Sequence, residues 1–194
     1  MQERKITPKD LALCALFIAL IVIGTFLKIP VPVVPFTLQF LFTMMAGLLL
    51  GGRLGAFSVF GYIVLGLIGM PVFTEGGGIW YIFKPSFGYI IGFCIAAYVT
   101  GMVANKVMNP SMKRILSANF IGLGIVYACG LSYCYVISNF VIHSPIGLSK
   151  LFLYCFWLVI PGDIFLCILS ALLAYKLIPL LNKMKHNERY QSFI

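Results

Sequence analysis

One acidic residue, Asp163, lies in the almost wholly apolar stretch FWLVIPGDIFLCIL, and its carboxyl group is the strongest candidate for chemistry in the chain. An ionised aspartate at the centre of a membrane helix costs about 2.5–3.5 kcal/mol on insertion scales, so it is retained where it lines a cavity or meets a partner. Pro161 and Gly162 precede it and loosen a helix, which would free nearby backbone groups to meet a ligand. We therefore predict that Asp163 contacts a ligand. The alternative is an internal ion pair with Lys84 or Lys150.

Polar side chains near the expected outer helix ends form a second group of candidates. An amide or hydroxyl group there could bond a polar group of a ligand, and the alternative is a hydrogen bond to a neighbouring helix. These candidates are Gln39, Ser86, Tyr89, Tyr135 and Asn139, of which the last two share a helix face. Trp80, in the glycine-rich loop TEGGGIWYIFK, could cover a pocket, although Trp also marks membrane interfaces. Glu75, in the same loop, is expected to be solvated.

The remaining residues exclude several other kinds of site. The chain has five acidic residues and two histidines, and only Asp163 of these acids falls well inside an expected span and not at its end. We therefore find neither paired carboxylates nor a nucleophile with a base. No glycine-rich phosphate loop is present, so we expect no enzyme and no ATPase. The six cysteines form no CxxC pair and are expected to be small buried hydrophobes, so we predict no metal site and no cofactor.

Composition places these residues in a lipid bilayer. Hydrophobic residues make up 61% of the chain and charged residues 10%, with a mean hydropathy of +1.04. Soluble domains carry about 25% charged residues, and a membrane helix needs about 20 apolar residues. The charge-free runs predict an all-α integral membrane protein, with one membrane domain over residues 1–194. Its six transmembrane helices are expected near residues 9–27, 36–51, 54–72, 85–106, 114–141 and 149–178.

Basic residues predict the orientation. With a cytoplasmic N-terminus, 11 of the 14 Lys and Arg residues fall inside, and only Lys28, Lys84 and Lys150 fall outside. Both termini are then cytoplasmic, and residues 1–8 and 183–194 are polar ends. The proline-rich segment IPVPVVPF should cap the outer face between the first two helices, because proline interrupts helix hydrogen bonding. This distribution explains the net charge of +9 without a nucleic-acid partner.

Small residues repeat every four positions in several spans, and such rows let helix backbones approach closely in lipid. Two rows are expected to pack inside the bundle, and they comprise Gly47, Gly51, Gly55, Gly88, Gly92 and Ala96. On the first helix, Ala15 and Ala19 lie one turn apart. For these two, a surface for a partner and the ordinary occurrence of alanine in a helix are equal alternatives.

The motifs together resemble those of one family. The run PVPVVPFTLQFLFTMMAGLLLGGRLGAFSVFGYIVLGLIGMPVF, followed by GGG, KPSFGYIIGF and PGD, is similar to the biotin-specific substrate-binding subunits of energy-coupling-factor (ECF) transporters, the BioY family. The resemblance covers roughly residues 8–175, and the order of the motifs makes it specific. It implies a six-helix S component that binds biotin tightly from outside. It also implies a membrane coupling subunit and two ATPase subunits as partners, in a bacterial plasma membrane.

The resemblance implies roles for several candidate residues. Asp163 would accept hydrogen bonds from the ureido N–H groups of biotin, because an ionised carboxylate only accepts and makes strong hydrogen bonds. Ala15 and Ala19 would dock on the coupling subunit. The chain departs from the family at KPSFGY, where GPTGGY is frequent, and at Leu166, where a lysine is frequent. We therefore expect Lys84 to bind the valerate carboxylate.

Two classes of function follow. The leading one is a biotin-binding membrane subunit of an ATP-driven importer, and the alternative is a stand-alone channel or facilitator for a small solute. The spacing of Ala15 and Ala19 favours the subunit, because a stand-alone carrier needs no docking face at the cytoplasmic half of its first helix.

Overall fold

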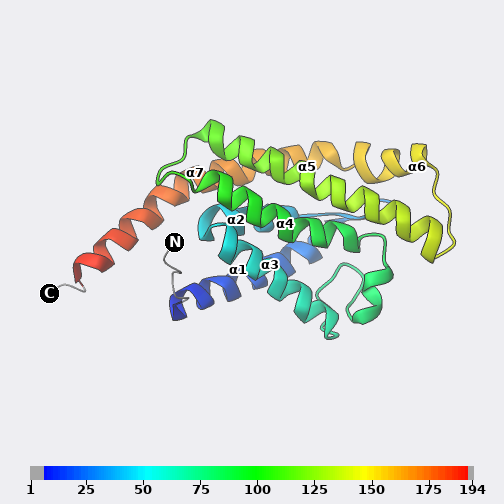
Figure 1. Cartoon of the computed structure of the whole chain (residues 1–194), viewed down its shortest axis with the longest axis horizontal. Coiled ribbons are helices and arrows are strands. Elements are labelled where there is room, and N and C mark those ends of the chain that lie inside the picture. Colours follow the sequence, from blue (N-terminus) through cyan, green and yellow to red (C-terminus); the bar gives the residue numbers. More distant parts are fainter. Residues whose placement is uncertain (1–6, 192–194) are drawn as a thin grey trace.

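Helices account for the apolar segments that the sequence predicts as spans (Figure 1). The computed structural model describes the backbone of residues 7–191 and the side chains of residues 7–182. The first five α-helices are α1 (Pro8–Phe26), α2 (Gln39–Leu50), α3 (Gly52–Leu67), α4 (Phe87–Ala104) and α5 (Met112–Val136). A π-helical turn, η2 (Ile137–Val141), continues α5, and a 3-10 helix, η1 (Ile79–Phe83), precedes α4.

The last expected span is interrupted. It consists of α6 (Leu148–Phe152), a π-helical turn η3 (Leu153–Trp157) and α7 (Ile160–Gln191). Asp163 therefore lies in the first turn of α7 and not in the middle of one continuous helix. Pro161 is compatible with this position, because N–H groups in the first turn of a helix have no intrahelical acceptor.

Local sequence signals set the other helix starts. Asp10 N donates to Thr7 Oγ1 at 3.2 Å, and Thr7 N donates to Asp10 Oδ2 at 3.0 Å, so the two residues form a capping box at α1. The Ser111 hydroxyl accepts from Arg114 N at the start of α5. Gly51 joins α2 to α3 with a φ of 90°, a conformation that favours glycine.

Helix length divides the expected spans into two groups. Within the described residues, four segments are long and apolar enough to cross a membrane: Pro8–Phe26, Phe87–Ala104, Met112–Val141 and Leu148–Asn182. Helices α2 and α3 are apolar but have only 12 and 16 residues. Both are shorter than expected, because Phe36 and Thr37 pair in a strand and the chain turns after Leu67. The start of α1 and the end of α7 lie at the same end of the molecule (Figure 1).

The proline-rich segment forms a β-hairpin. Strand β1 (Lys28–Ile29) pairs antiparallel with β2 (Phe36–Thr37), with Lys28 opposite Thr37. The three prolines lie in the connection between the strands, where their missing N–H groups leave the ladder intact. The absence of helix in this segment follows the prediction, whereas the two short strands were not expected.

Close helix packing surrounds the core. Helix α4 packs most extensively against α5, and α2 and α3 also pack on it. A Cβ atom added at Gly47 would lie 2.4 Å from Ala97 O, and one added at Gly92 would lie 3.0 Å from Val126 Cα. The packing role predicted for these two glycines is confirmed.

Candidate binding site

A pocket lies between the β-hairpin, η1, η3, the starts of α2, α4 and α7, and the middle of α5. Four of the sequence candidates line it: Gln39, Ser86, Tyr89 and Asp163. Most of the other lining residues are apolar, and they come from all of these elements. A mostly apolar pocket with a few polar groups is the usual form of a small-molecule site.

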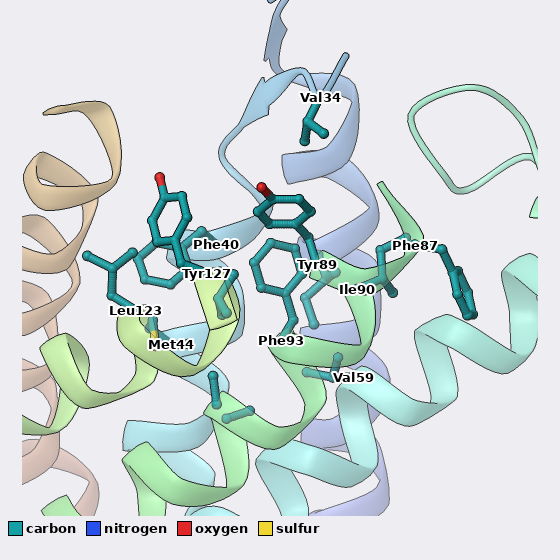
Figure 2. Packing of buried hydrophobic residues seen from close by; sticks show 14 of the residues in the cluster. Val34, Phe40, Met44, Val59, Phe87, Tyr89, Ile90, Phe93, Leu123 and Tyr127 are labelled. Carbon is teal, nitrogen blue, oxygen red and sulfur yellow. The ribbon is translucent and has the colours of Figure 1, made fainter. Parts of the chain in front are cut away.

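Aromatic rings form much of the pocket wall. The lining rings of Phe40 and Phe93 have centroids 6.2 Å apart, and the lining ring of Tyr89 packs edge-to-face at 6.2 Å on Tyr127, which lies behind the wall. Figure 2 shows the hydroxyl ends of both tyrosines pointing toward the level of Val34, which the hairpin contributes. The wall is therefore apolar at its base and carries hydroxyl groups nearer the hairpin.

Asp163 is the buried charged group of this pocket. It is 9% exposed, and the Tyr127 hydroxyl donates to its Oδ2 atom at 2.6 Å. The N-terminal turn of a helix also favours a negative charge, because its N–H groups carry a partial positive charge. No Lys or Arg in the described residues forms an ion pair with Asp163, and Lys84 pairs elsewhere. The ion-pair alternative for Asp163 is thus wrong within this part of the chain.

Gln39 contributes an amide whose nitrogen atom lacks a partner in the described residues, although its side chain lies beside the Tyr62 hydroxyl. The side chain is 3% exposed and lines the pocket, and its Nε2 atom makes no hydrogen bond within the described residues. A buried donor without a partner costs about 1–3 kcal/mol. Since the two ends of an amide are assigned from their hydrogen bonds, Gln39 could present either its donor or its acceptor to a ligand.

The two candidates on α4 are held by neighbouring groups. The Tyr89 hydroxyl donates to Cys155 O at 3.1 Å, which ties α4 to η3. The Ser86 hydroxyl lies 3.2 Å from the Tyr81 hydroxyl, which in turn lies 2.8 Å from Thr74 Oγ1. All five residues line the pocket, so this hydrogen-bonded chain forms part of its wall.

Lys84 and Trp80 do not line this pocket. The Lys84 ammonium lies 2.7 Å from Glu75 Oε2, and both side chains are about half exposed, at 50% and 47%. The hydrogen bond and the charge of Glu75 raise the pKa of Lys84. Glu75 is therefore paired, although a purely solvated residue was expected. Trp80 is 77% exposed and packs on Phe83, with ring centroids 5.9 Å apart.

Tyr135 and Asn139 also lie outside the pocket lining. Asn139 Nδ2 donates to Tyr135 O at 2.9 Å and to Ile146 O at 3.3 Å, so its amide holds the end of α5 to the following loop. Tyr135 is 36% exposed. The two residues share a helix face, and the hydrogen bond between them is a local structural contact.

The first helix presents its small residues outward. Ala15 and Ala19 are both exposed, whereas Cys14, Phe17 and Ile21 of the same helix are buried. Neither alanine is therefore packed inside the described part of the bundle, and their docking role stays a prediction.

Tyr127 is the contributor that the sequence interpretation missed. Its hydroxyl lies in a largely apolar segment and is hydrogen-bonded across elements, as is usual for a buried tyrosine. A tyrosine inside an apolar helix was the available signal for Tyr127, but it does not reveal which distant residue receives the hydrogen bond.

Comparison with known proteins gives consistent matches. The model of the BioY family matches residues 1–183. A probable biotin transporter BioY from Lysinibacillus sphaericus is 48% identical over 168 residues, which cover 87% of this chain and 86% of the relative. The biotin transporter BioY from Thermotoga maritima is 34% identical, over 87% of this chain and 95% of the relative. A crystal structure of the S-component for biotin from an ECF-type ABC transporter matches with a TM-score of 0.65 and 32% identity, over 87% of this chain and 90% of that one.

Proposed function

The chain belongs to the BioY family, and we propose that it is the biotin-binding membrane subunit of an ECF-type ABC importer. In this role it captures biotin from outside the cell for ATP-driven uptake. The observation that carries the proposal is the acidic acceptor Asp163, which is buried at the start of α7 in an otherwise largely apolar pocket. The names of the two relatives and of the structural neighbour agree with this ligand.

The ureido ring of biotin fits the polar end of the pocket. Because Tyr127 already donates to Oδ2 of Asp163, the Oδ1 atom is the acceptor left for a ureido N–H group. The Gln39 amide, whose Nε2 atom has no partner in the described residues, could bond the ureido group from another side of the pocket. The rings of Phe40 and Phe93 offer an apolar surface to the sulfur-containing ring.

The valerate carboxylate requires a cation or several donors outside this acidic region. Lys84 remains our candidate, because it is half exposed and follows η1, whose Tyr81 lines the pocket. A carboxylate that binds Lys84 must compete with Glu75, which lies 2.7 Å from the ammonium group. The Ser86 hydroxyl, two residues further along the chain, could donate to the same carboxylate.

We propose six membrane crossings with both termini in the cytoplasm and the hairpin on the outer face. The common position of the start of α1 and the end of α7 supports an even number of crossings (Figure 1). At 1.5 Å per residue, the 12 residues of α2 reach only about 18 Å of a hydrocarbon core of about 30 Å. The hairpin must therefore complete this crossing. Reporter fusions after Lys113 and after Ser144 should report inside and outside.

Ala15 and Ala19 are proposed to dock on the membrane coupling subunit, which two ATPase subunits accompany. Their exposure on α1 supports this role, because small side chains let a second helix approach closely in lipid. Neither ATP hydrolysis nor another enzyme activity is assigned to this chain.

Titration of the purified subunit with biotin tests the proposal. Tight binding by the lone chain, without uptake by vesicles that contain only this chain, is expected for a subunit of an importer. Uptake by the lone chain down a gradient would instead support a stand-alone facilitator. A folded chain that does not bind biotin would contradict both the ligand and the site.

A further inference from the structure

Two cysteine thiols contact each other at the wall of the pocket. Cys134, near the end of α5, and Cys155, in η3, have Sγ atoms 3.9 Å apart. Their side chains are 0% and 1% exposed, and Cys155 is also a lining residue of the pocket. In the described part of the chain, this is the one pair of cysteines whose sulfur atoms are in contact.

The separation of the two sulfur atoms is close to that needed for a covalent bond. A disulfide has an S–S distance of about 2.05 Å, so the two atoms would have to approach by about 1.9 Å in total. Rotation of the two side chains can supply part of this movement. A shift of the η3 backbone must supply the remaining movement. This element is a short π-helical turn, a kind of structure that is often found at functional sites.

We propose that Cys134 and Cys155 are a redox-active thiol pair, which a low-molecular-weight disulfide oxidises to an intramolecular disulfide. The Cys155 thiolate attacks the oxidant and releases one thiol, which leaves a mixed disulfide on Cys155. The Cys134 thiolate then attacks Cys155 Sγ and releases the second thiol. The pair loses two protons and two electrons, and the oxidant leaves as two thiols.

Access through the pocket sets the order of these steps. Cys155 lines the pocket, whereas Cys134 is fully buried behind it, so an oxidant meets Cys155 first. In the proposed topology the pocket opens to the outside, where disulfides persist.

The disulfide would join two neighbouring elements beside the site. It would tie η3 to α5, and η3 already holds Tyr89 through the carbonyl group of Cys155. A ligand in the pocket covers Cys155 and should therefore protect the pair from oxidation. This protection rests on the proposed function, whereas formation of the disulfide does not.

Treatment of the purified subunit with 4,4′-dithiodipyridine tests the proposal. Peptide mapping by mass spectrometry without reductant should find a linked peptide that joins Cys134 to Cys155 and has lost two hydrogen atoms. The Cys134→Ser variant should instead retain the thiopyridyl adduct on Cys155. The Cys129→Ser variant, changed at a half-buried cysteine of the same helix, should form the link as the parent does.

Two results would overturn the proposal. Separate adducts on both cysteines of the parent, or two unmodified thiols after the half-buried cysteines have reacted, would show that the pair is not redox-active. Biotin at about a hundred times its Kd leaves about 1% of sites free, so linkage should slow by about tenfold or more. If biotin binds in a separate titration but linkage proceeds at an equal rate, access through the pocket is wrong. If biotin does not bind and the link still forms, the proposed function fails and the thiol pair stands.

Discussion

Replacement of Asp163 by Asn should weaken biotin binding by about ten- to a hundredfold. Tyr127 donates to Oδ2 at 2.6 Å, so we propose Oδ1, which has no protein donor among the described residues, as the main acceptor for the ligand. In the variant, the side chain either turns an NH₂ group toward the ureido donors or offers a single neutral oxygen. Hydrogen bonds to charged groups are worth about 1.5–3 kcal/mol, and each 1.4 kcal/mol is a tenfold change in Kd, which gives the stated range.

Calorimetric titration of the purified subunit in lipid nanodiscs measures this loss. Asp10→Asn is the matched control, because Asp10 is the other buried acidic side chain in the described residues. It belongs to the capping box of α1 and does not line the pocket. The control variant should lose thermal stability and keep its affinity for biotin.

A double variant distinguishes ligand contact from a purely structural pair. Tyr127→Phe alone should weaken biotin less than Asp163→Asn, because it removes the group that orients the carboxylate but keeps the charge. Adding Tyr127→Phe to Asp163→Asn should not restore binding. If the double variant binds biotin as the parent does, Asp163 serves only to pair with Tyr127 and our assignment is refuted.

Three further predictions address the rest of the site and the partner surface. Lys84→Ala should lower the affinity for biotin but not the affinity for an uncharged biotin amide, and Glu75→Gln should raise the affinity for biotin because it releases the Lys84 ammonium group. If titration shows equal changes in affinity for both ligands, the valerate carboxylate binds elsewhere. Gln39→Leu should raise the melting temperature and lower biotin affinity, because it removes an unpaired buried donor; a lower melting temperature with full affinity would make Gln39 structural. Ala15→Trp should abolish copurification of the coupling subunit and leave biotin titration unchanged, and a folded variant that loses biotin would contradict the docking role.

Apolar length and helix-breaking residues made the helical segments predictable. The charge-free runs correspond to the observed helices, because lipid favours segments that satisfy their own backbone hydrogen bonds. Their boundaries were less accurate. Phe36 and Thr37 were assigned to a helix but pair in the hairpin, and Leu38 N bonds to Leu27 O in the same region. Such pairing depends on a partner strand, which local composition does not specify.

Asp163 was predictable as an exceptional residue, whereas its partner was not. A lone acid in an apolar run signals a cavity or an interaction by its energetic cost alone. The partner Tyr127 lies 36 residues away, so only the packing of α5 against α7 brings the two side chains together. For the same reason, the sequence suggested Lys84 as an ion partner of Asp163, although Lys84 pairs with Glu75.

The interruption of the last span places Asp163 at the start of a helix, where its carboxylate could bind a ligand without a neighbouring lysine. The Tyr127 hydroxyl donates to the carboxylate of Asp163, which lies in the first turn of α7. One turn later, Leu166 is 1% exposed and apolar, so that position supplies no cation to neutralise the carboxylate. The acceptor therefore stays available for neutral N–H donors, and it repels a second carboxylate. We infer that biotin enters with its ureido ring toward Asp163 and leaves its valerate carboxylate at the mouth of the pocket, where basic residues such as Lys84 can compete for it.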